Sequence, residues 1–287
     1  MPSPATPLFT THERLWRDNR YVYPVISRRA KGLSIGVNLN PDMACNFDCV
    51  YCSVDRSVPA TVRSVDLAVV RAELDALLVL VVSGGLWAVP PFDRTPPELR
   101  RLNDIAFSGD GEPTAAAEFP AACRLADELL RWHGAAAKIV VITNATLLQR
   151  PEVAAALAFL DDVPSEIWAK LDAGTEDYYQ RVDRSKVPLA RVLDNLLAAG
   201  RQRPIVIQSL FMRLDGVGPS QAEIDAYGMR LRALVDQGCR IRLVQVYTTA
   251  RATAESFVTP LPAADVDAIA RCVRALGIAA EAYYGPG

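Results

Sequence analysis

Short β-branched, apolar runs alternate with longer amphipathic segments along most of this chain, and this alternation constrains the fold more than any other feature. The runs are Leu33–Leu39, Ile105–Phe107, Lys138–Thr143, Glu166–Leu171, Ile205–Phe211 and Arg240–Tyr247, with a weaker one at Ile278–Tyr283. The helix-like segments between them lie near Asp66–Val82, Ala116–Trp132, Glu152–Leu160, Leu189–Ala199, Gln221–Asp236 and Ala263–Leu276. Strands separated by helices of this length are joined by right-handed crossovers, which build a parallel sheet. The alternation therefore predicts an α/β fold, either an open doubly wound sheet or an incomplete barrel.

The pattern also indicates one main domain. Residues 1–31 are rich in Pro and Arg and predict an irregular N-terminal extension, whereas residues 32–287 predict a core domain that ends in an αβ element. Gly84–Pro97 reads as an irregular insertion before the second strand, and Gly200 is expected to end a helix. A chain of 287 residues is long enough to bury a core without disulfides.

Cysteine usage and hydropathy indicate a reducing, aqueous compartment. Six cysteines in a chain of this length are too sparse for a secreted disulfide scaffold. The N-terminus lacks the pattern of a signal peptide, and the most apolar stretch, Leu77–Val82, is too short to span a bilayer. We expect a cytoplasmic protein without a membrane partner, in which clustered cysteines hold a metal.

The charge of the chain gives no general attraction to nucleic acid, because 31 basic residues face 33 acidic ones. One local excess stands out between Arg14 and Lys31, where six basic residues accompany a single acid, Asp18. Such a patch predicts phosphate binding, with the aromatic residues Trp16, Tyr21 and Tyr23 stacking on bases. The alternative is a solvated arm.

Three cysteines, Cys45, Cys49 and Cys52, follow the first strand in a C-x3-C-x2-C pattern. A loop at the carboxyl end of a parallel strand is where such sheets bind ligands. A structural zinc site needs four ligands, and no fourth Cys or His is nearby in the sequence. A four-iron cluster held by three thiolates leaves one iron open to a ligand. Zinc with a distant fourth ligand and three reduced core thiols are the alternatives.

The other three cysteines carry no shared pattern. Cys123 and Cys272 lie in helical segments and Cys239 precedes a strand, each among apolar residues. We expect buried thiols without a ligand role.

The motifs that follow successive strands resemble those of the radical S-adenosylmethionine (SAM) superfamily. The three cysteines, with Tyr51 between the last two, are similar to its cluster motif. Residues 107–114 (FSGDGEPT) resemble its Gly-Gly-Glu-like motif, residues 143–147 (TNATL) its Thr-Asn-Gly motif, and residues 170–173 (KLDA) follow the fourth strand. Within the superfamily, residues 108–114, 168–174 and 244–251 are most similar to Fe–S oxidoreductases related to wyosine-type tRNA-modifying enzymes.

The resemblance, which runs from about Leu33 to Tyr247, implies a partial (β/α)6 barrel, a [4Fe-4S] cluster and SAM. It implies that Cys45, Cys49 and Cys52 bind the cluster and that an external one-electron donor, a ferredoxin or flavodoxin, reduces it. Reductive cleavage of SAM would then yield a 5′-deoxyadenosyl radical that abstracts hydrogen from a substrate.

The resemblance also assigns the residues that would contact SAM. Glu112, rather than Asp110, is favoured for the SAM ammonium, and the glycines of the motif allow close backbone approach. Ala145 stands where the family has a glycine, which argues against a positive φ there. The full set expected to bind SAM is Tyr51, Gly109, Asp110, Gly111, Glu112, Asn144, Lys170, Asp172 and Gln208.

The substrate is not named by the sequence. One hypothesis is an RNA or nucleotide-derived substrate held through Arg14–Lys31. A second is a protein, peptide or small metabolite, and a third, of another class, is an Fe–S electron-transfer or zinc-binding module without SAM chemistry.

Overall fold

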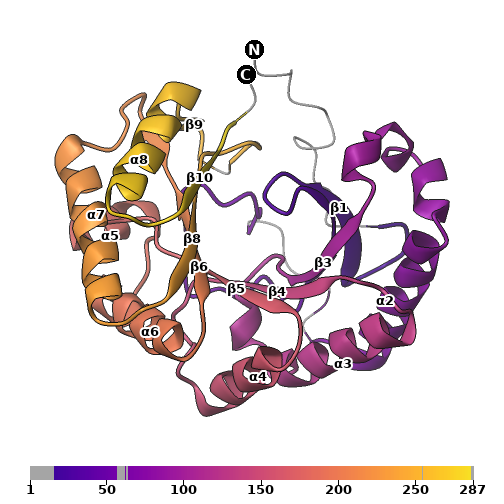
Figure 1. Cartoon of the computed structure of the whole chain (residues 1–287). Coiled ribbons are helices and arrows are strands. Elements are labelled where there is room, and N and C mark those ends of the chain that lie inside the picture. The colour runs from indigo at the N-terminus through magenta and orange to yellow at the C-terminus, as the bar shows by residue number, and fades with distance from the viewer. Residues whose placement is uncertain (1–15, 57–61, 63, 254, 286–287) are drawn as a thin grey trace.

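The computed structural model describes residues 16–56, 62, 64–253 and 255–285. One eight-stranded sheet, in the order β1-β2-β3-β4-β5-β6-β8-β10, curls into a half-barrel with helices on its outer face (Figure 1). The strands are β1 Val22–Ser27, β2 Gly32–Val37, β3 Leu102–Phe107, β4 Lys138–Thr143, β5 Ser165–Lys170, β6 Ile205–Leu210, β8 Ile241–Tyr247 and β10 Ala280–Tyr283. The α/β prediction is confirmed, and of its two forms the sheet adopts the incomplete barrel.

Apart from α5 Glu176–Val182, which the periodicity did not predict, the helices follow the predicted segments closely. They are α2 Leu67–Val82, α3 Phe119–Trp132, α4 Pro151–Asp161, α5 Glu176–Val182, α6 Leu189–Gln202, α7 Gln221–Asp236 and α8 Ala263–Ala275. Gly200 does not end its helix, because α6 continues to Gln202. A Cβ at Gly200 would lie 2.1 Å from Sγ of Cys239, so close helix–sheet packing explains that glycine. Among the described residues, no helix is both long and apolar enough to cross a membrane.

Strand β1 corrects the expectation of an irregular segment before residue 32. It pairs antiparallel with β2, from Val22 opposite Val37 to Ser27 opposite Gly32. All the other pairs in the large sheet are parallel. Val22 and Ile26 are buried, so apolar residues of this segment pack into the main core although arginines flank it. A second, two-stranded sheet joins β7 Met212–Leu214 to β9 Val258–Pro260.

The predicted insertion 84–97 contains short 3-10 helices, Gly85–Ala88 and Phe92–Arg94, and further ones lie at Pro97–Leu99 and Pro113–Ala115. Leu86 and Phe92 are buried in the main core. The insertion is therefore packed against the domain.

Two layers of apolar side chains lie on opposite faces of the half-barrel. The larger one fills the space between the outer face and the helices. The smaller one lies inside the barrel and consists of Ala106, Val140, Trp168 and Val206 on neighbouring strands. Because side chains alternate between the faces of a strand, every second residue of each strand points into this lumen.

Candidate cofactor site at the mouth of the half-barrel

The loop after β2 carries Cys45, Cys49 and Cys52 to one wall of a cavity of about 320 Å³ at the carboxyl ends of the strands. Cavities of this size are typical of small-molecule sites. Each of the three cysteines is half-buried and has a free thiol. The structure therefore brings together the three residues that the sequence predicts to act jointly.

Glycines of the motif after β3 let the cysteine loop pack closely. The amide of Glu112 donates a hydrogen bond to the carbonyl of Ala44 at 3.2 Å. A Cβ on Gly111 would lie 2.0 Å from that carbonyl oxygen, and one on Gly109 would lie 2.3 Å from Oδ1 of Asn38. In this structure the glycines are required by close contacts with the protein's own backbone and side chains, and the approach to SAM stays a prediction.

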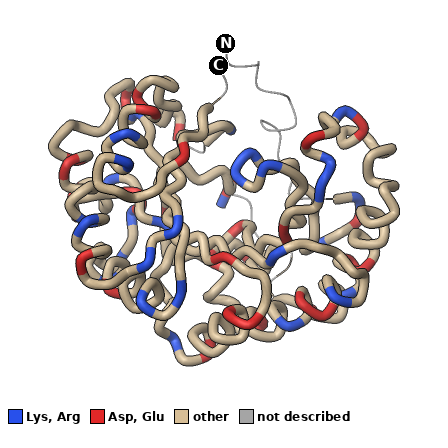
Figure 2. The backbone as a smooth tube through the Cα atoms, in the orientation of Figure 1, with Lys and Arg blue, Asp and Glu red and all other residues tan. Residues whose placement is uncertain are grey.

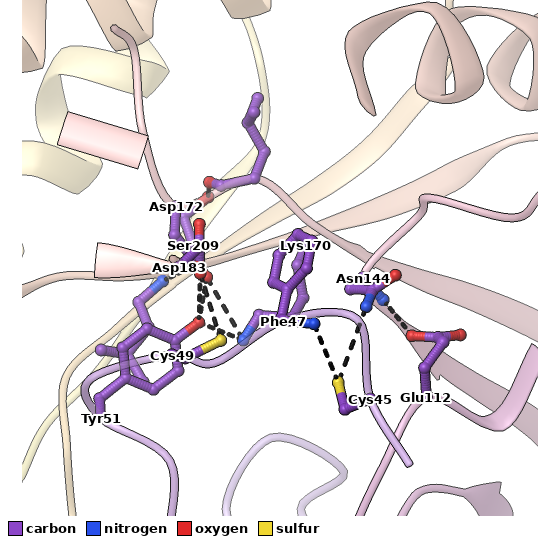
Figure 3. A network of polar contacts seen from close by, with 12 residues as sticks. Cys45, Phe47, Cys49, Tyr51, Glu112, Asn144, Lys170, Asp172, Asp183 and Ser209 are labelled. Atoms are coloured by element: carbon purple, nitrogen blue, oxygen red, sulfur yellow. Dashed lines mark hydrogen bonds and ion pairs between the residues drawn. The ribbon is translucent and has the colours of Figure 1, made fainter. Parts of the chain in front are cut away.

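The three thiols have different polar neighbours (Figure 3). The Phe47 amide donates to Sγ of Cys45 at 3.4 Å, and the Cys49 thiol donates to Oδ1 of Asp183 at 3.4 Å. Nη1 of Arg56 donates to Sγ of Cys52 at 3.5 Å. Burial raises the pKa of Cys45 and Cys49, so both thiols are protonated until a metal displaces the proton.

The arrangement of these donors fits a cluster better than a single ion. Among the described residues, no three His, Cys, Asp or Glu side chains converge as ligands of one metal. In a four-iron cluster each thiolate binds a different iron, so the sulfurs stand farther apart than around one zinc ion. Three thiols that share a cavity wall without a fourth Cys among its described lining match the donor set of a cluster with one open iron.

Glu112 is a buried residue of the cavity lining, and both of its carboxylate oxygens accept hydrogen bonds. Oε1 accepts from the amide and hydroxyl of Thr114 at 3.1 and 2.5 Å and from the Thr143 hydroxyl at 2.7 Å. Oε2 accepts from the Asn144 amide at 2.7 Å. Burial raises the pKa of Glu112, although these hydrogen bonds oppose the shift. The carboxylate thus joins the loops after β3 and β4.

Asp110, by contrast, is half-buried and lies in the cavity lining. Its Oδ2 accepts from Nδ2 of Asn38 at 2.6 Å. Asp110 is therefore the more exposed of the two acids in the motif.

A buried polar network lies behind Cys49 (Figure 3). The Tyr51 hydroxyl donates to the carboxylate of Asp172 and accepts from the ammonium of Lys170. Oδ1 of Asp183 lies 3.1 Å from the same hydroxyl, and Lys170 Nζ lies 3.3 Å from Oδ2 of Asp172. The ammonium is also 4.4 Å from the centre of the Tyr51 ring. The Tyr51 hydroxyl is therefore occupied within the protein.

The charges of this network depend on each other. Burial disfavours the charge of Lys170, yet Asp172 and the other anionic groups nearby raise its pKa well above its usual value. Burial and the charge of Asp172 raise the pKa of Asp183 to about 8. Asp172 also accepts from the Leu210 amide at 2.7 Å, which ties the loop after β5 to β6.

Asn144 and Ala145 form the turn after β4. Oδ1 of Asn144 accepts from the amide and hydroxyl of Thr146, and Nδ2 donates to Oδ1 of Asn46 at 2.6 Å. Ala145 has a φ of 65°, which contradicts the expectation that alanine excludes a positive φ here. Asn195 donates to the carbonyls of Ala145 and Thr146 at 2.8 Å, and these hydrogen bonds hold the turn in the conformation that glycine would adopt more easily.

Most residues predicted to contact SAM line the cavity. These are Tyr51, Gly109, Asp110, Gly111, Glu112, Asn144 and Lys170. Asp172 and Gln208 lie outside its described lining, because Asp172 is buried under Tyr51 and Gln208 donates from Nε2 to Gln245 at 2.8 Å. Their partners indicate positioning and packing roles in this structure.

Several lining or supporting residues were not expected from the sequence. Arg56 lies beside Cys52, Asp183 beside Cys49, and Asp104 faces the lumen from the middle of β3. An acid in an otherwise apolar strand is a signal that singles out Asp104. Asp183 has no such signal, because it follows α5, which the periodicity did not predict.

Of the three cysteines outside the site, two are buried and one is exposed. Cys123 and Cys239 are buried, as predicted. Cys272 is exposed, because the buried face of α8 is formed by Val266, Ile269, Ala270 and Val273.

The basic segment before β2 does not form one surface patch. Arg14 lies outside the described residues, Arg17 stacks on Trp16, and Lys31 pairs with Glu281. Arg28 and Arg29 instead line the cavity. The aromatic residues expected to stack on bases are not available for it, since Tyr21 and Tyr23 are buried and Trp16 packs against Phe92.

Comparisons with known proteins agree with these motifs. Residues 40–213 match the family model described as the Radical SAM superfamily. UPF0026 protein MJ1312 of Methanocaldococcus jannaschii is 28% identical over 179 residues, which cover 61% of this chain and 46% of that protein. GTPase Obg of Brachyspira hyodysenteriae is 26% identical over 174 residues, 58% of this chain and 21% of that protein. The chain thus spans less than half the length of these curated relatives.

Solved structures share the fold at low identity. A radical SAM methyltransferase from Sphaerobacter thermophilus has a TM-score of 0.58 and 19% identity, with 93% of this chain and 70% of that chain covered. TYW1 with a lysine–pyruvate adduct bound has a TM-score of 0.54 and 15% identity, with 86% and 74% covered. SuiB of Streptococcus suis bound to SAM has a TM-score of 0.52 and 12% identity, with 91% and 49% covered. These likenesses identify the curled sheet as a partial barrel of the kind found in radical SAM proteins.

Proposed function

This chain belongs to the radical SAM superfamily, and from that premise we propose that it is an enzyme that binds a [4Fe-4S] cluster and SAM at the mouth of its half-barrel. Cys45, Cys49 and Cys52 would hold three irons. When bound, the cluster supplies the electron that cleaves SAM to methionine and a 5′-deoxyadenosyl radical for C–H abstraction. One observation carries the proposal: the three thiols and the SAM-motif residues after β3 and β4 line the same cavity.

The residues of the motif after β3 would receive the methionine part of SAM. Glu112 accepts four hydrogen bonds from the loops after β3 and β4, three of them at Oε1, so we assign it the role of positioning these loops. Asp110 lines the cavity with a carboxylate that can accept from the SAM ammonium. This reverses the preference that the sequence favours and keeps both acids in the site.

The polar network behind Cys49 would hold the side chains of the site in their binding conformation before the ligands bind. Tyr51 is held by Lys170 and Asp172, so its ring stays beside the cysteine loop. A preorganised wall holds SAM close to the cysteine loop without a further loss of side-chain freedom. The half-barrel walls and the apolar layer around Trp168 would exclude water from the substrate.

The electron and the substrate come from outside this site. A ferredoxin or flavodoxin would supply the electron. An RNA or nucleotide-derived substrate would present phosphate, whereas a peptide or metabolite would present carboxylate or amide groups. The alternative of another class is a zinc-binding or Fe–S electron-transfer module without SAM chemistry. Iron reconstitution separates the enzyme from the zinc module, and cleavage of SAM by the reconstituted protein separates it from the electron-transfer module.

Anaerobic reconstitution with iron and sulfide tests the proposal. The wild-type chain should take up about four irons per chain with a brown chromophore. Cys49→Ala should lose most of that iron, whereas Cys272→Ala, which changes an exposed thiol outside the site, should keep it. Full iron loading of Cys49→Ala, or uptake of zinc but no iron by the wild type, would refute it.

A further inference from the structure

The turn between β1 and β2 enters the lumen from the amino ends of the parallel strands. Residues 28–31 connect Ser27 to Gly32, and Figures 1 and 2 show this basic turn inside the curl of the sheet. Ala30 packs against the inner apolar layer. Lys31 Nζ lies 2.9 Å from Oε2 of Glu281 on β10, so the turn bridges the open side of the half-barrel. It forms a floor below the cavity.

The floor is held in one conformation. The amide of Lys31 donates to the Ser27 carbonyl at 2.8 Å, and the amide of Ala30 donates to the Ser27 hydroxyl at 3.1 Å. The side-chain amide of Asn103 donates to the Ala30 carbonyl. Side chains on such a turn meet a ligand in a geometry that exists before binding.

Two guanidinium groups point from this floor into the cavity. Both Arg28 and Arg29 are half-buried and lie in its lining. Cζ of Arg29 lies 4.7 Å from the ring centre of Tyr247 and 5.7 Å from that of Trp168. Within the described part of the chain, neither guanidinium has a carboxylate at ion-pair distance. Arg28 has no aromatic partner there either, so packing alone does not explain it.

The carboxylate of Asp104 interacts electrostatically with Arg29, whereas the other charged groups nearby, Lys170 and Glu166, already have ion-pair partners. Lys170 is paired with Asp172, and Glu166, below the inner layer, is paired with Lys138 at 2.7 Å and Arg242 at 3.0 Å. Burial, followed by the charge of Arg29, lowers the pKa of Arg28, which reflects two close cations away from bulk water. Half-buried like charges are stabilised when an anion binds between them.

A buried acceptor faces the same space. Asp104 is 1% exposed and lines the cavity, and the Ser34 hydroxyl donates to its Oδ1. Its Oδ2 is buried and has no hydrogen-bond partner among the described residues. A buried carboxylate oxygen without a partner is rare in proteins and indicates a ligand that donates to it.

We propose that Arg28, Arg29 and Asp104 form a substrate subsite on the lumen floor that binds an anionic group, a phosphate or a carboxylate, with an N–H or O–H donor next to it. Calling the ligand the substrate rests on the proposed function, whereas anion binding itself does not. The two guanidiniums bind the anion, and Oδ2 of Asp104 accepts from the neighbouring donor. The subsite lies below the SAM-motif residues, so anion and SAM bind together.

Calorimetric titration at fixed ionic strength tests this subsite. The probes are pyrophosphate and malonate, titrated into the full-length reconstituted protein with and without saturating SAM. Arg28→Gln/Arg29→Gln should weaken binding of the preferred probe about tenfold or more, as expected for two charge-assisted contacts. Arg17→Gln/Arg20→Gln, which removes the same charge from exposed positions of the same segment, should bind as the wild type does. Tighter binding of pyrophosphate assigns phosphate, and tighter binding of malonate assigns carboxylate.

The single variant Arg28→Gln guards against misfolding, because the Arg28 side chain makes no hydrogen bond, ion pair or cation–π contact with another described residue; about a fivefold weaker affinity is expected. The proposal would be overturned by unchanged affinity in Arg28→Gln/Arg29→Gln, by an equal loss in Arg17→Gln/Arg20→Gln, or by displacement of the anion by SAM. The titration needs no turnover. If the wild type binds the anion at the floor but forms no 5′-deoxyadenosine, the proposed function fails and the subsite stands.

Discussion

Replacing Asp104 by asparagine should stabilise this protein at neutral pH, although the change removes a charge from a residue that accepts a hydrogen bond from Ser34. The carboxylate is buried, and burial raises its pKa from its usual 3.8 to about 6 despite the Ser34 hydrogen bond. Lys138 and Arg29 lower the pKa, and Glu166 raises it. The ionised form is thus the less favourable one in the folded protein.

The sign and size of the effect follow from linkage. Between about pH 4 and pH 6 the unfolded chain has lost the Asp104 proton while the folded chain keeps it, so the stability of the wild type falls as pH rises through this window. A rise of the pKa from 3.8 to about 6 corresponds to a free-energy loss of about 3 kcal/mol once the folded protein is ionised. The asparagine variant lacks this loss. Its advantage should grow from near zero at about pH 4 to about 2 to 3 kcal/mol above about pH 6.

Urea unfolding of the apo chain at several pH values, followed by circular dichroism, measures this difference. Asp194→Asn on the exposed face of α6 is the control and should stay within about 0.5 kcal/mol of the wild type throughout. A pH-independent difference for Asp104→Asn, or a variant less stable than the wild type at about pH 7.5, would refute the reasoning. Either result would also count against the proposal that Oδ2 of Asp104, which has no partner among the described residues, accepts a hydrogen bond from a ligand.

Three further experiments test the geometry elsewhere. Glu112→Gln should lower the free energy of unfolding by about 2 to 3 kcal/mol, because the NH2 group of glutamine would face N–H or O–H donors that now bind a carboxylate oxygen. Equal stability of the variant and the wild type in urea would contradict the four hydrogen bonds. Ala145→Gly should stay within about 1 kcal/mol, since relief of the left-handed φ offsets the lost methyl, whereas Ala156→Gly in α4 should cost about 1 to 2 kcal/mol. Iodoacetamide should label exposed Cys272 in the native protein and Cys123 only after unfolding, and mass spectrometry reports both.

The strands and the cysteine loop were predictable because their signals are local. Runs such as Lys138–Thr143 have a composition typical of a parallel strand covered on both faces, and the strands end within two residues of the predicted runs. Cys45, Cys49 and Cys52 follow the first of these strands, so the topology alone places them at the mouth of the barrel. Their spacing therefore predicted their shared position correctly.

Features that depend on partners distant in sequence were not predictable. Asp183 meets Cys49 across 134 residues, and Glu112 meets Asn144 across 32, so no local pattern shows which acid is engaged. Ala145 keeps its positive φ because Asn195 holds the turn from α6. The arginines of the β1–β2 turn look like a solvated arm until the antiparallel pairing of β1 carries them into the lumen.

The central claim is that this chain cleaves SAM with a cluster held by three cysteines, and product analysis tests it most directly. Reconstituted protein, reduced anaerobically with dithionite and given SAM, should form 5′-deoxyadenosine and methionine in equal amounts, and Cys49→Ala should form neither. Formation of neither product by a wild-type chain that carries its full four irons would contradict the claim.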